Sequence, residues 1–240
     1  MLPKIDTPVY ELELPLSKKS IQYRPFKVKE QKILLMAMES DDKESIERNV
    51  KQILNNCTVS EGIKIDDLPV VDVEYYFLQL RAKSVGEVVE NKYVCNNEVN
   101  GSPCNNTMEV KIDLNQITVE RSEEVDDVIQ LTPTVSIKLC YPKFSVMEKL
   151  KNSSTSVDMA FDIVVESIDY IYDGEQYYYA AESDRKELMD FIESLNTEQF
   201  NKIESFFKSL PKLTKKLEFT CNKCGFEHKI DVEGLENFFG

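Results

Sequence analysis

The chain has 240 residues and a net charge of −14, and 42% of its residues are hydrophobic. A chain of this length can bury a sizeable core, and no apolar run approaches the roughly 18 residues of a membrane-spanning helix. Its acidic groups concentrate in residues 31–204, which carry 34 acidic and 17 basic side chains. Because such a surface repels phosphate backbones, we expect no nucleic-acid partner. No secretory signal follows Met1, so we expect an intracellular protein with reduced thiols.

Residues 1–85 are predicted to form an N-terminal region with a β-hairpin followed by helices. Residues 9–14 alternate between apolar and polar side chains, and residues 21–26 form a second strand-like segment after a short polar loop. Apolar side chains then recur at helical spacing. The predicted helices span residues 27–40, 42–55 and 71–84.

Four of the six cysteines form two pairs that lie far apart in the sequence, each between strand-like segments. Cys95 and Cys104 are separated by eight residues, whereas Cys221 and Cys224 belong to a Cys-x2-Cys-Gly knuckle. Two hairpins with cysteines at their tips are typical of a zinc ribbon, in which four thiolates bind one Zn²⁺ as a tetrahedron. The sequence therefore predicts a structural zinc bound by all four cysteines.

Other interpretations of these thiols stay open. Eight residues between Cys95 and Cys104 exceed the usual ligand spacing of about two to four, so the pairs could be an unrelated dithiol and a disulfide or two idle thiols. A redox Cys-x2-Cys site is disfavoured, because strands rather than a strand and a helix flank the knuckle. His228, the only histidine, could replace one of the first two cysteines as a ligand. The lone cysteines Cys57 and Cys140 are expected to be buried apolar side chains.

The second half of the chain predicts strands and then helices. Residues 127–142 are strand-like, and we expect 86–142 and 211–240 to form one β region that contains the split ribbon. Residues 143–210 are predicted to be a helical insertion in this region. Its predicted helices span 144–151 and 157–172, followed by one helix capped by Ser183 and one capped by Asn196. The predicted fold class is α+β.

The sequence contains no recognisable catalytic motif. The only histidine, His228, lies beside the zinc hairpin, so a Ser-His-Asp triad would have to use it, and a His-Glu-x-x-His site is impossible. Seven glycines leave little material for a Gly-rich phosphate loop. Four cysteine ligands would fill the coordination shell of zinc and leave no position for a reactive water. We therefore expect a protein without enzymatic activity.

Several stretches of the chain carry a resemblance to a known family. They are residues 2–15 (Leu-Pro-Lys-Ile-Asp-Thr-Pro-Val-Tyr-Glu-Leu-Glu-Leu-Pro), 23–26 (Tyr-Arg-Pro-Phe), 29–37, 206–213 and 234–239 (Gly-Leu-Glu-Asn-Phe-Phe). Together with the C-terminal Cys-x2-Cys knuckle, they resemble the baseplate family of T-even-type contractile-tailed bacteriophages. The first cysteine pair departs from the family pattern, which has a tighter knuckle there.

The resemblance implies a non-enzymatic protein of the baseplate central hub, either built into the hub or helping it to assemble. Its partners would be other baseplate hub and tail proteins in a hetero-oligomeric assembly. Its location would be the host cytoplasm during assembly, and the virion tail if it is a permanent component. The residues alone leave two further classes open, a zinc-ribbon regulator of host or viral transcription or replication machinery, and a thiol-redox enzyme that uses Cys221 and Cys224.

Overall fold

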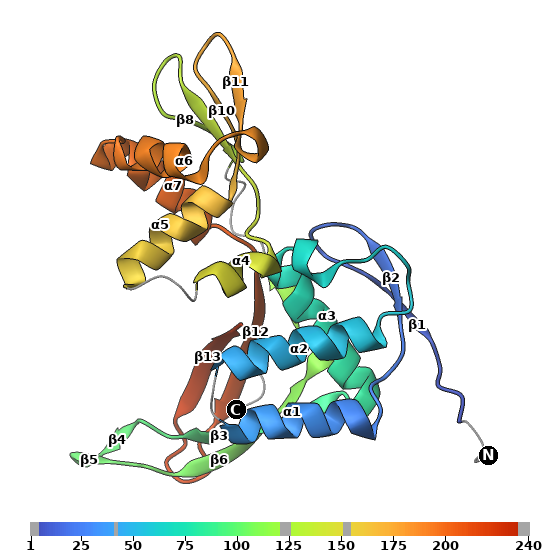
Figure 1. Cartoon of the computed structure of the whole chain (residues 1–240). Helices are drawn as coiled ribbons and strands as arrows, with labels where there is room; N and C mark the ends of the chain where they lie inside the picture. Colours follow the sequence, from blue (N-terminus) through green and yellow to red (C-terminus); the bar gives the residue numbers. More distant parts are fainter. Residues whose placement is uncertain (1–4, 41–42, 121–125, 151–154, 235–240) are drawn as a thin grey trace. The chain divides into compact units, whose positions relative to one another are not determined.

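The computed structural model describes residues 5–40, 43–120, 126–150 and 155–234 (Figure 1). The chain forms two compact units. The first unit combines residues 1–65, 71–120 and 212–240, and the second combines 66–70 and 121–211. Each unit contains both helices and strands, which confirms the predicted α+β class. The three-part division expected from the sequence stays a prediction.

The first unit begins with the predicted β-hairpin and helices. In the hairpin, Leu12 lies opposite Ile21, and Ile21 and Tyr23 turn their side chains into the core. This alternation follows from the side-chain period of two in a strand. The elements are β1 (Tyr10–Glu13), β2 (Ser20–Tyr23), α1 (Val28–Ser40), α2 (Lys43–Cys57) and α3 (Val70–Val85). Helices α1 and α2 run side by side (Figure 1).

A buried ion pair connects the hairpin to the first two helices. The carboxylate of Glu30 has no exposed surface and accepts hydrogen bonds from Arg24 Nη2 (3.1 Å) and from the backbone N–H of Lys27 (2.8 Å). The Arg24 guanidinium also donates to the carbonyl of Asn56 (2.9 Å), and the Arg24 backbone N–H donates to the carbonyl of Cys57 (2.9 Å). These bonds hold together the end of β2, the start of α1 and the end of α2.

A second buried carboxylate fixes the turn of the same hairpin. Asp72, in the first turn of α3, is fully buried and accepts the backbone N–H groups of Leu16 (2.8 Å) and Ser17 (2.9 Å). Buried backbone donors need such partners, because an unpaired N–H costs the free energy of a lost hydrogen bond. Asp72 therefore anchors the β1–β2 turn on α3.

The cysteine hairpins are also part of the first unit. Strands β3 and β6 pair antiparallel, as do β12 and β13, and β7 pairs with the other edge of β12. Their bounds are Val88–Val94 (β3), Thr107–Asp113 (β6), Thr118–Glu120 (β7), Lys212–Thr220 (β12) and Glu227–Glu233 (β13). A small hairpin of β4 (Glu98–Val99) and β5 (Ser102–Pro103) extends from the first one.

A shared core joins these hairpins to helix α3. It contains fully buried leucines of α3 and β12, Leu78 and Leu213, together with Ile112 of β6 and Val232 of β13. Each buried aliphatic side chain of this size contributes about 1.5–3 kcal/mol relative to exposure. The two hairpins are therefore held near each other by hydrophobic packing, as well as by the pairing of β7 with β12.

The second unit is a four-stranded sheet with helices, and its strand order is β11-β10-β9-β8. The strands are β8 (Val128–Gln130), β9 (Ser136–Leu139), β10 (Ile168–Tyr172) and β11 (Tyr177–Tyr179). The helices are α4 (Phe144–Lys149), α5 (Ser156–Glu166), α6 (Arg185–Glu193) and α7 (Thr197–Lys208). Residues from α5, α6 and α7 share one hydrophobic core with one face of the sheet (Figure 1).

The helix predicted over residues 157–172 is wrong in its C-terminal part. Helix α5 ends at Glu166, and β10 begins at Ile168. Val164, Ile168 and Ile171 fit a helical period, and all three belong to the core of this unit. Ile168 and Ile171 reach the core from a strand because the strand register shifts between Ile168 and Tyr170. This bulge places the side chains of both isoleucines on the core face. The β-branched and aromatic side chains of the segment favour the strand that β9 and β11 stabilise.

One strand assignment and two helix caps of the same unit can also be compared with the sequence predictions. Strand β9 pairs with β10, and β8 pairs with the other edge of β9, while the assignment of residues 127–142 to the β region of the cysteine hairpins stays a prediction. The helix expected to begin at Ser183 is capped instead by Asp184, whose carboxylate accepts the N–H of Lys186 at 2.8 Å. The cap at Asn196 is confirmed as a reciprocal capping box with Gln199.

The buried ion pair of the first unit predicts a large effect of one mutation. Replacing Glu30 with Gln leaves the Arg24 charge without its carboxylate, so we expect the free energy of unfolding to fall by about 2–4 kcal/mol. Urea titration at neutral pH measures this change. The control is Glu13→Gln, since the pair of Glu13 with Lys18 is 69% and 71% exposed and should contribute less than about 1 kcal/mol. Equal losses in the two variants would contradict the role of Glu30.

The same carboxylate predicts how stability depends on pH. Burial raises the pKa of Glu30, but the hydrogen bonds from Arg24 and from the Lys27 N–H outweigh burial and hold the pKa below its ordinary value. A carboxyl group whose pKa is lowered in the folded state stabilises the fold at pH values above its pKa in the unfolded chain, about 4.3. This stabilisation is lost as the pH falls through the pKa of the folded state. The stability difference between wild type and Glu30→Gln should therefore shrink below about pH 4. Urea titrations between neutral and acidic pH check this, and a constant difference would contradict it.

Candidate metal centre

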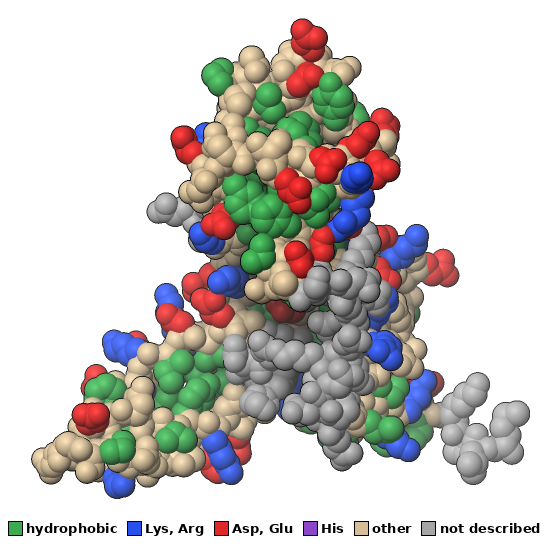
Figure 2. Space-filling model, turned by 60° about the vertical axis from the view of Figure 1, so that its left-hand side comes forward, with side chains coloured by type: hydrophobic (Ala, Val, Ile, Leu, Met, Phe, Trp, Pro, Cys, Tyr) green, Lys and Arg blue, Asp and Glu red, His purple; other side chains and the backbone are tan. Residues whose placement is uncertain are grey.

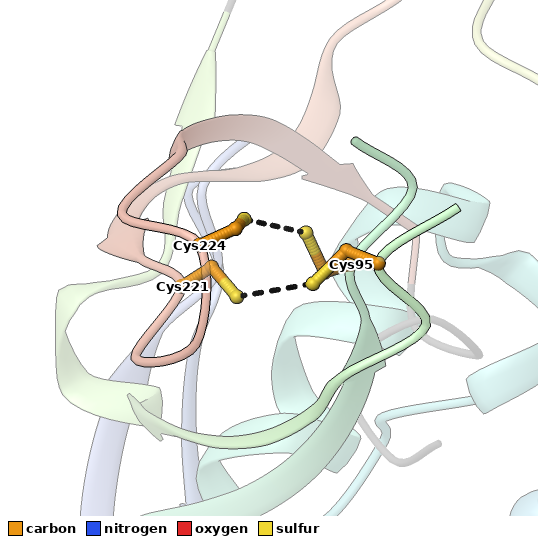
Figure 3. A group of neighbouring side chains, drawn as sticks. Cys95, Cys221 and Cys224 are labelled. Atoms are coloured by element: carbon orange, nitrogen blue, oxygen red, sulfur yellow. Dashed lines mark hydrogen bonds between the residues drawn. The ribbon is translucent and has the colours of Figure 1, made fainter. Parts of the chain in front are cut away.

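The structure brings the four paired cysteines together. The Sγ atoms of Cys95, Cys104, Cys221 and Cys224 all lie within 4.8 Å of one another. Across the two hairpins, the Cys95 and Cys224 sulfurs are 3.7 Å apart, and the Cys104 and Cys221 sulfurs are 3.9 Å apart. Figure 3 shows Cys221 and Cys224 on one loop, with their side chains directed toward the other hairpin, on which Cys95 lies opposite Cys224. The predicted grouping of the two distant pairs is therefore present in the fold.

The second cysteine loop is a knuckle whose backbone turns the two sulfurs to the same side. The N–H of Cys221 donates to the carbonyl of Phe226 at 2.8 Å, and the N–H of Gly225 donates to the carbonyl of Cys221 at 2.9 Å. Gly225 has a φ of 73°, which lies in the left-handed region that glycine adopts at no steric cost. The Gly after the second cysteine is thus required by the turn.

The first cysteine loop repeats this backbone arrangement despite its longer spacing. The N–H of Cys95 donates to the carbonyl of Asn106 at 2.8 Å, and the N–H of Asn105 donates to the carbonyl of Cys95 at 3.1 Å. Asn105 follows the second cysteine, as Gly225 does, and its φ of 50° is also left-handed. Asparagine tolerates this conformation better than most residues. The first loop is therefore a knuckle of the same kind.

An exposed hairpin accounts for the extra residues of the first loop. Strands β4 and β5 pair over residues 98–103, all exposed where they lie in the strands, and the N–H of Cys104 donates to the carbonyl of Asn97 at 2.8 Å. This bond closes the base of the small hairpin. Without residues 98–103, two residues would separate Cys95 from Cys104, as in the second knuckle. The eight-residue spacing is thus a normal knuckle with an insertion.

The geometry of the four sulfurs fits a tetrahedral metal ion. Zn–S bonds of about 2.3 Å place the sulfurs of a regular tetrahedron about 3.8 Å apart, close to the 3.7 Å and 3.9 Å between the hairpins. All four cysteines are free thiols. A set of four sulfur ligands suits Zn²⁺ or an iron–sulfur centre and not Mg²⁺ or Ca²⁺, which prefer oxygen. The site can therefore hold a closed four-coordinate ion.

Backbone hydrogen bonds and burial change the thiol pKa values in opposite directions. The N–H of Cys224, together with that of Lys223, donates to the Cys221 sulfur and lowers the pKa of Cys221 to about 6 despite its burial. Burial raises the pKa of Cys95 to about 12 and also raises the pKa of Cys104. Four sulfurs this close can all be thiolates only beside a cation, because neighbouring negative charges disfavour ionisation.

Polar side chains around the sulfurs form a second layer that the cysteine pattern does not reveal. The Asn97 amide donates to the Cys224 sulfur at 3.7 Å, and the Asn106 amide donates to the Cys221 sulfur at 3.6 Å. The Asn106 amide also donates to the side-chain oxygen of Asn222 at 2.6 Å, and Lys223 donates to the carbonyl of Cys104 at 3.0 Å. Donors to thiolate ligands orient them and tune a bound metal. Asn97, Asn106 and Lys223 each lie two residues after a cysteine, and this spacing is the one sign of the second layer in the sequence.

His228 lies next to the site without belonging to the group of four sulfurs. Its Nε2 is 3.3 Å from the Cys95 sulfur, and its ring stacks on Phe219 at a centroid distance of 5.2 Å. The side chain belongs to strand β13 and is only 7% exposed. The arrangement suits a hydrogen-bond partner of Cys95 rather than a replacement ligand.

The two lone cysteines lie elsewhere. Cys57 is fully buried, with its sulfur 3.7 Å from the Arg24 guanidinium, and burial raises its pKa to about 11. Cys140 is half-buried, and its thiol donates to the carbonyl of Ser167 at 3.2 Å. The structure therefore confirms the buried apolar role for Cys57 and shows a partly exposed position for Cys140.

The inserted hairpin predicts that the first loop tolerates a deletion. Removing residues 98–103 leaves Cys95-Asn96-Asn97-Cys, and we expect the free energy of unfolding to change by less than about 1 kcal/mol, because the knuckle bonds persist and loop entropy varies slowly with length. Gly225→Ala, which places a side chain at a left-handed φ, should cost about 1–2 kcal/mol. Thermal and urea unfolding measure both. If deletion of residues 98–103 lowers the free energy of unfolding more than Gly225→Ala does, these residues are not an insertion into a normal knuckle.

Comparison with known proteins identifies the family. The family model described as T4 bacteriophage base plate protein matches residues 7–240. No curated protein and no solved structure matches the chain significantly. No helix in the described part of the chain is long and apolar enough to cross a membrane. The C-terminal Phe238 and Phe239, which contribute to the resemblance seen in the sequence, lie within the matched range but outside the described residues. The chain therefore belongs to the T4 bacteriophage base plate protein family.

Proposed function

We propose that this chain is a non-enzymatic structural or assembly protein of the baseplate central hub, braced by one structural Zn²⁺ bound by Cys95, Cys104, Cys221 and Cys224. It acts through contacts with other hub and tail proteins, in the host cytoplasm during assembly and, as a permanent component, in the virion tail. The observation that carries the proposal is the convergence of four sulfurs at tetrahedral spacing in a chain of the baseplate family.

The composition of the site supports a brace and not a catalyst. Four sulfur ligands complete the coordination of Zn²⁺, and no position is left for a water or a substrate. The ion joins loops that are 117 residues apart along the chain, from Cys104 to Cys221. A cross-link of this length restricts the unfolded chain more than a local one does, and it closes a zinc ribbon split between two distant hairpins.

The structural zinc is tested by metal content and by two matched mutations. Protein prepared with reductant and without chelator should contain one zinc per chain, and Cys221→Ser should lose it together with several kcal/mol of stability, since structural zinc contributes about 10–16 kcal/mol of apparent binding free energy in small peptides. Cys140→Ser, a lone cysteine, is the control and should retain both. Elemental analysis and thermal unfolding measure these outcomes, and metal-free wild type with an unchanged melting temperature in Cys221→Ser would disprove the zinc.

The place in the hub is tested in infected cells. Affinity purification of the tagged chain should recover hub and tail proteins, and mass spectrometry of purified particles separates a virion component from a transient assembly factor. Recovery of transcription or replication proteins instead would favour the regulator class, whose acidic surface would act by protein contact. Particles assembled normally without the chain would contradict a role in the baseplate.

A further inference from the structure

The second unit carries an open groove between helices α5, α6 and α7. Its volume is about 640 Å³, within the range of about 300–1,000 Å³ seen for binding pockets. Figure 2 shows hydrophobic side chains gathered on the face of this unit that bears the three helices, with acidic side chains and a few basic ones around them. Nothing in the proposed hub role or the zinc site uses this groove.

The floor of the groove is apolar because aromatic and aliphatic side chains remain after the core is filled. Phe161 of α5 and Phe200 of α7 stack with ring centroids 5.0 Å apart, and Met189 and Leu195 line the groove beside them. Val157, in the first turn of α5, is 62% exposed at the edge. Large apolar side chains that converge on one open surface are typical of sites that bind another protein.

The rim of the groove is acidic. Among the described residues that line it, Asp158, Asp162 and Glu193 are charged and none is basic. Arg185 pairs with Asp162 and, at 3.5 Å, with Glu166, so it already neutralises part of this charge. The second unit as a whole has 20 acidic and nine basic side chains. Its field therefore attracts a positively charged partner.

We propose that this groove binds an amphipathic helix of another protein, with apolar side chains inserted between α5 and α7 and Lys or Arg side chains beside Asp158 and Glu193. A groove between helices with an apolar floor takes the apolar face of a helix, whose anchors recur at every third or fourth position. The charged rim sets the orientation and excludes acidic partners. Identification of that helix with a baseplate component rests on the hub role proposed above, whereas the chemistry of the groove does not.

Other classes of ligand fit the observations less well. Nucleic acids and anionic membrane surfaces carry negative charge, which the acidic rim repels. A small apolar molecule would contact the floor but gain nothing from the negative charge of the rim. A basic amphipathic helix is the ligand that satisfies both the floor and the rim.

Synthetic peptides test the groove directly. The probe is a helical peptide of about 18 residues with Leu at helical spacing and Lys on the flanking positions, compared with one peptide in which Glu replaces Lys and one in which Ser replaces Leu. Fluorescence anisotropy with the full chain should detect binding of the Leu and Lys peptide but not of the two control peptides. The affinity should fall as the salt concentration rises, because salt screens the charges of the rim. Backbone amide shifts in an NMR titration should lie in α5, α6 and α7.

Matched variants separate the groove from the general acidity of the chain. Asp158→Asn combined with Glu193→Gln should weaken the Lys peptide about three- to tenfold, as expected for two exposed charge contacts. The control, Glu175→Gln with Glu187→Gln, changes the net charge equally at exposed positions outside the groove and should bind as wild type does. Val157→Ser should weaken binding at any salt concentration, and the exposed Val85→Ser should not. Thermal unfolding confirms that each variant is folded.

The proposal is overturned if the Glu peptide binds as tightly as the Lys peptide, if both charge pairs weaken binding equally, or if the shifts map outside the three helices. A photo-cross-linking residue at position 157 extends the test to infected cells. The segment it captures should combine helical apolar spacing with a net positive charge. Capture of such a segment from a protein outside the tail would retain the groove and reject the hub role, whereas capture of acidic or non-helical segments would reject the groove.

Discussion

The first unit depends on one constraint, which is that the Cys95–Cys104 loop and the Cys221–Cys224 loop face each other with all four sulfurs between them. Each knuckle directs its two sulfurs to one side through the same pair of backbone hydrogen bonds, from the Cys95 and Cys221 N–H groups and back to their carbonyls. Hydrophobic packing of Leu78, Ile112 and Leu213 brings the hairpins into one core. The sulfur geometry therefore results from local turns and tertiary packing together, which is why a cation at the centre would connect distant parts of the chain so effectively.

The requirement at each knuckle is conformational, and the spacing between cysteines is secondary. Gly225 and Asn105 both take a left-handed φ directly after the second cysteine. The exposed β4–β5 hairpin adds residues 98–103 without changing these turns. A count of intervening residues would underrate this candidate metal site, because the count measures chain length, whereas the positions of the sulfurs depend on where the backbone turns back.

In our proposal the second unit serves recognition, whereas the first unit contains the buried pairs that stabilise its fold. Buried, paired groups such as Glu30 with Arg24 stabilise the first unit, together with the cysteine cluster. The second unit has 20 of the 43 acidic side chains and the apolar groove beside Phe161 and Phe200. A baseplate protein needs a surface that attracts the correct neighbours and repels others, and single-sign charge around an apolar floor meets that need.

The sequence by itself determined the α+β class, the first hairpin and helices, the Asn196 cap, the four cysteines and the family resemblance, because these depend on local period, turn chemistry and residue type. Tertiary structure decided the rest. Residues 168–172 became a strand because β9 and β11 offered hydrogen bonds and a bulge kept Ile168 and Ile171 in the core. The amides of Asn97 and Asn106, the position of His228 and the groove between three helices depend on contacts between segments far apart in the chain. No local pattern encodes such contacts, since their free energy exists only once the chain has folded.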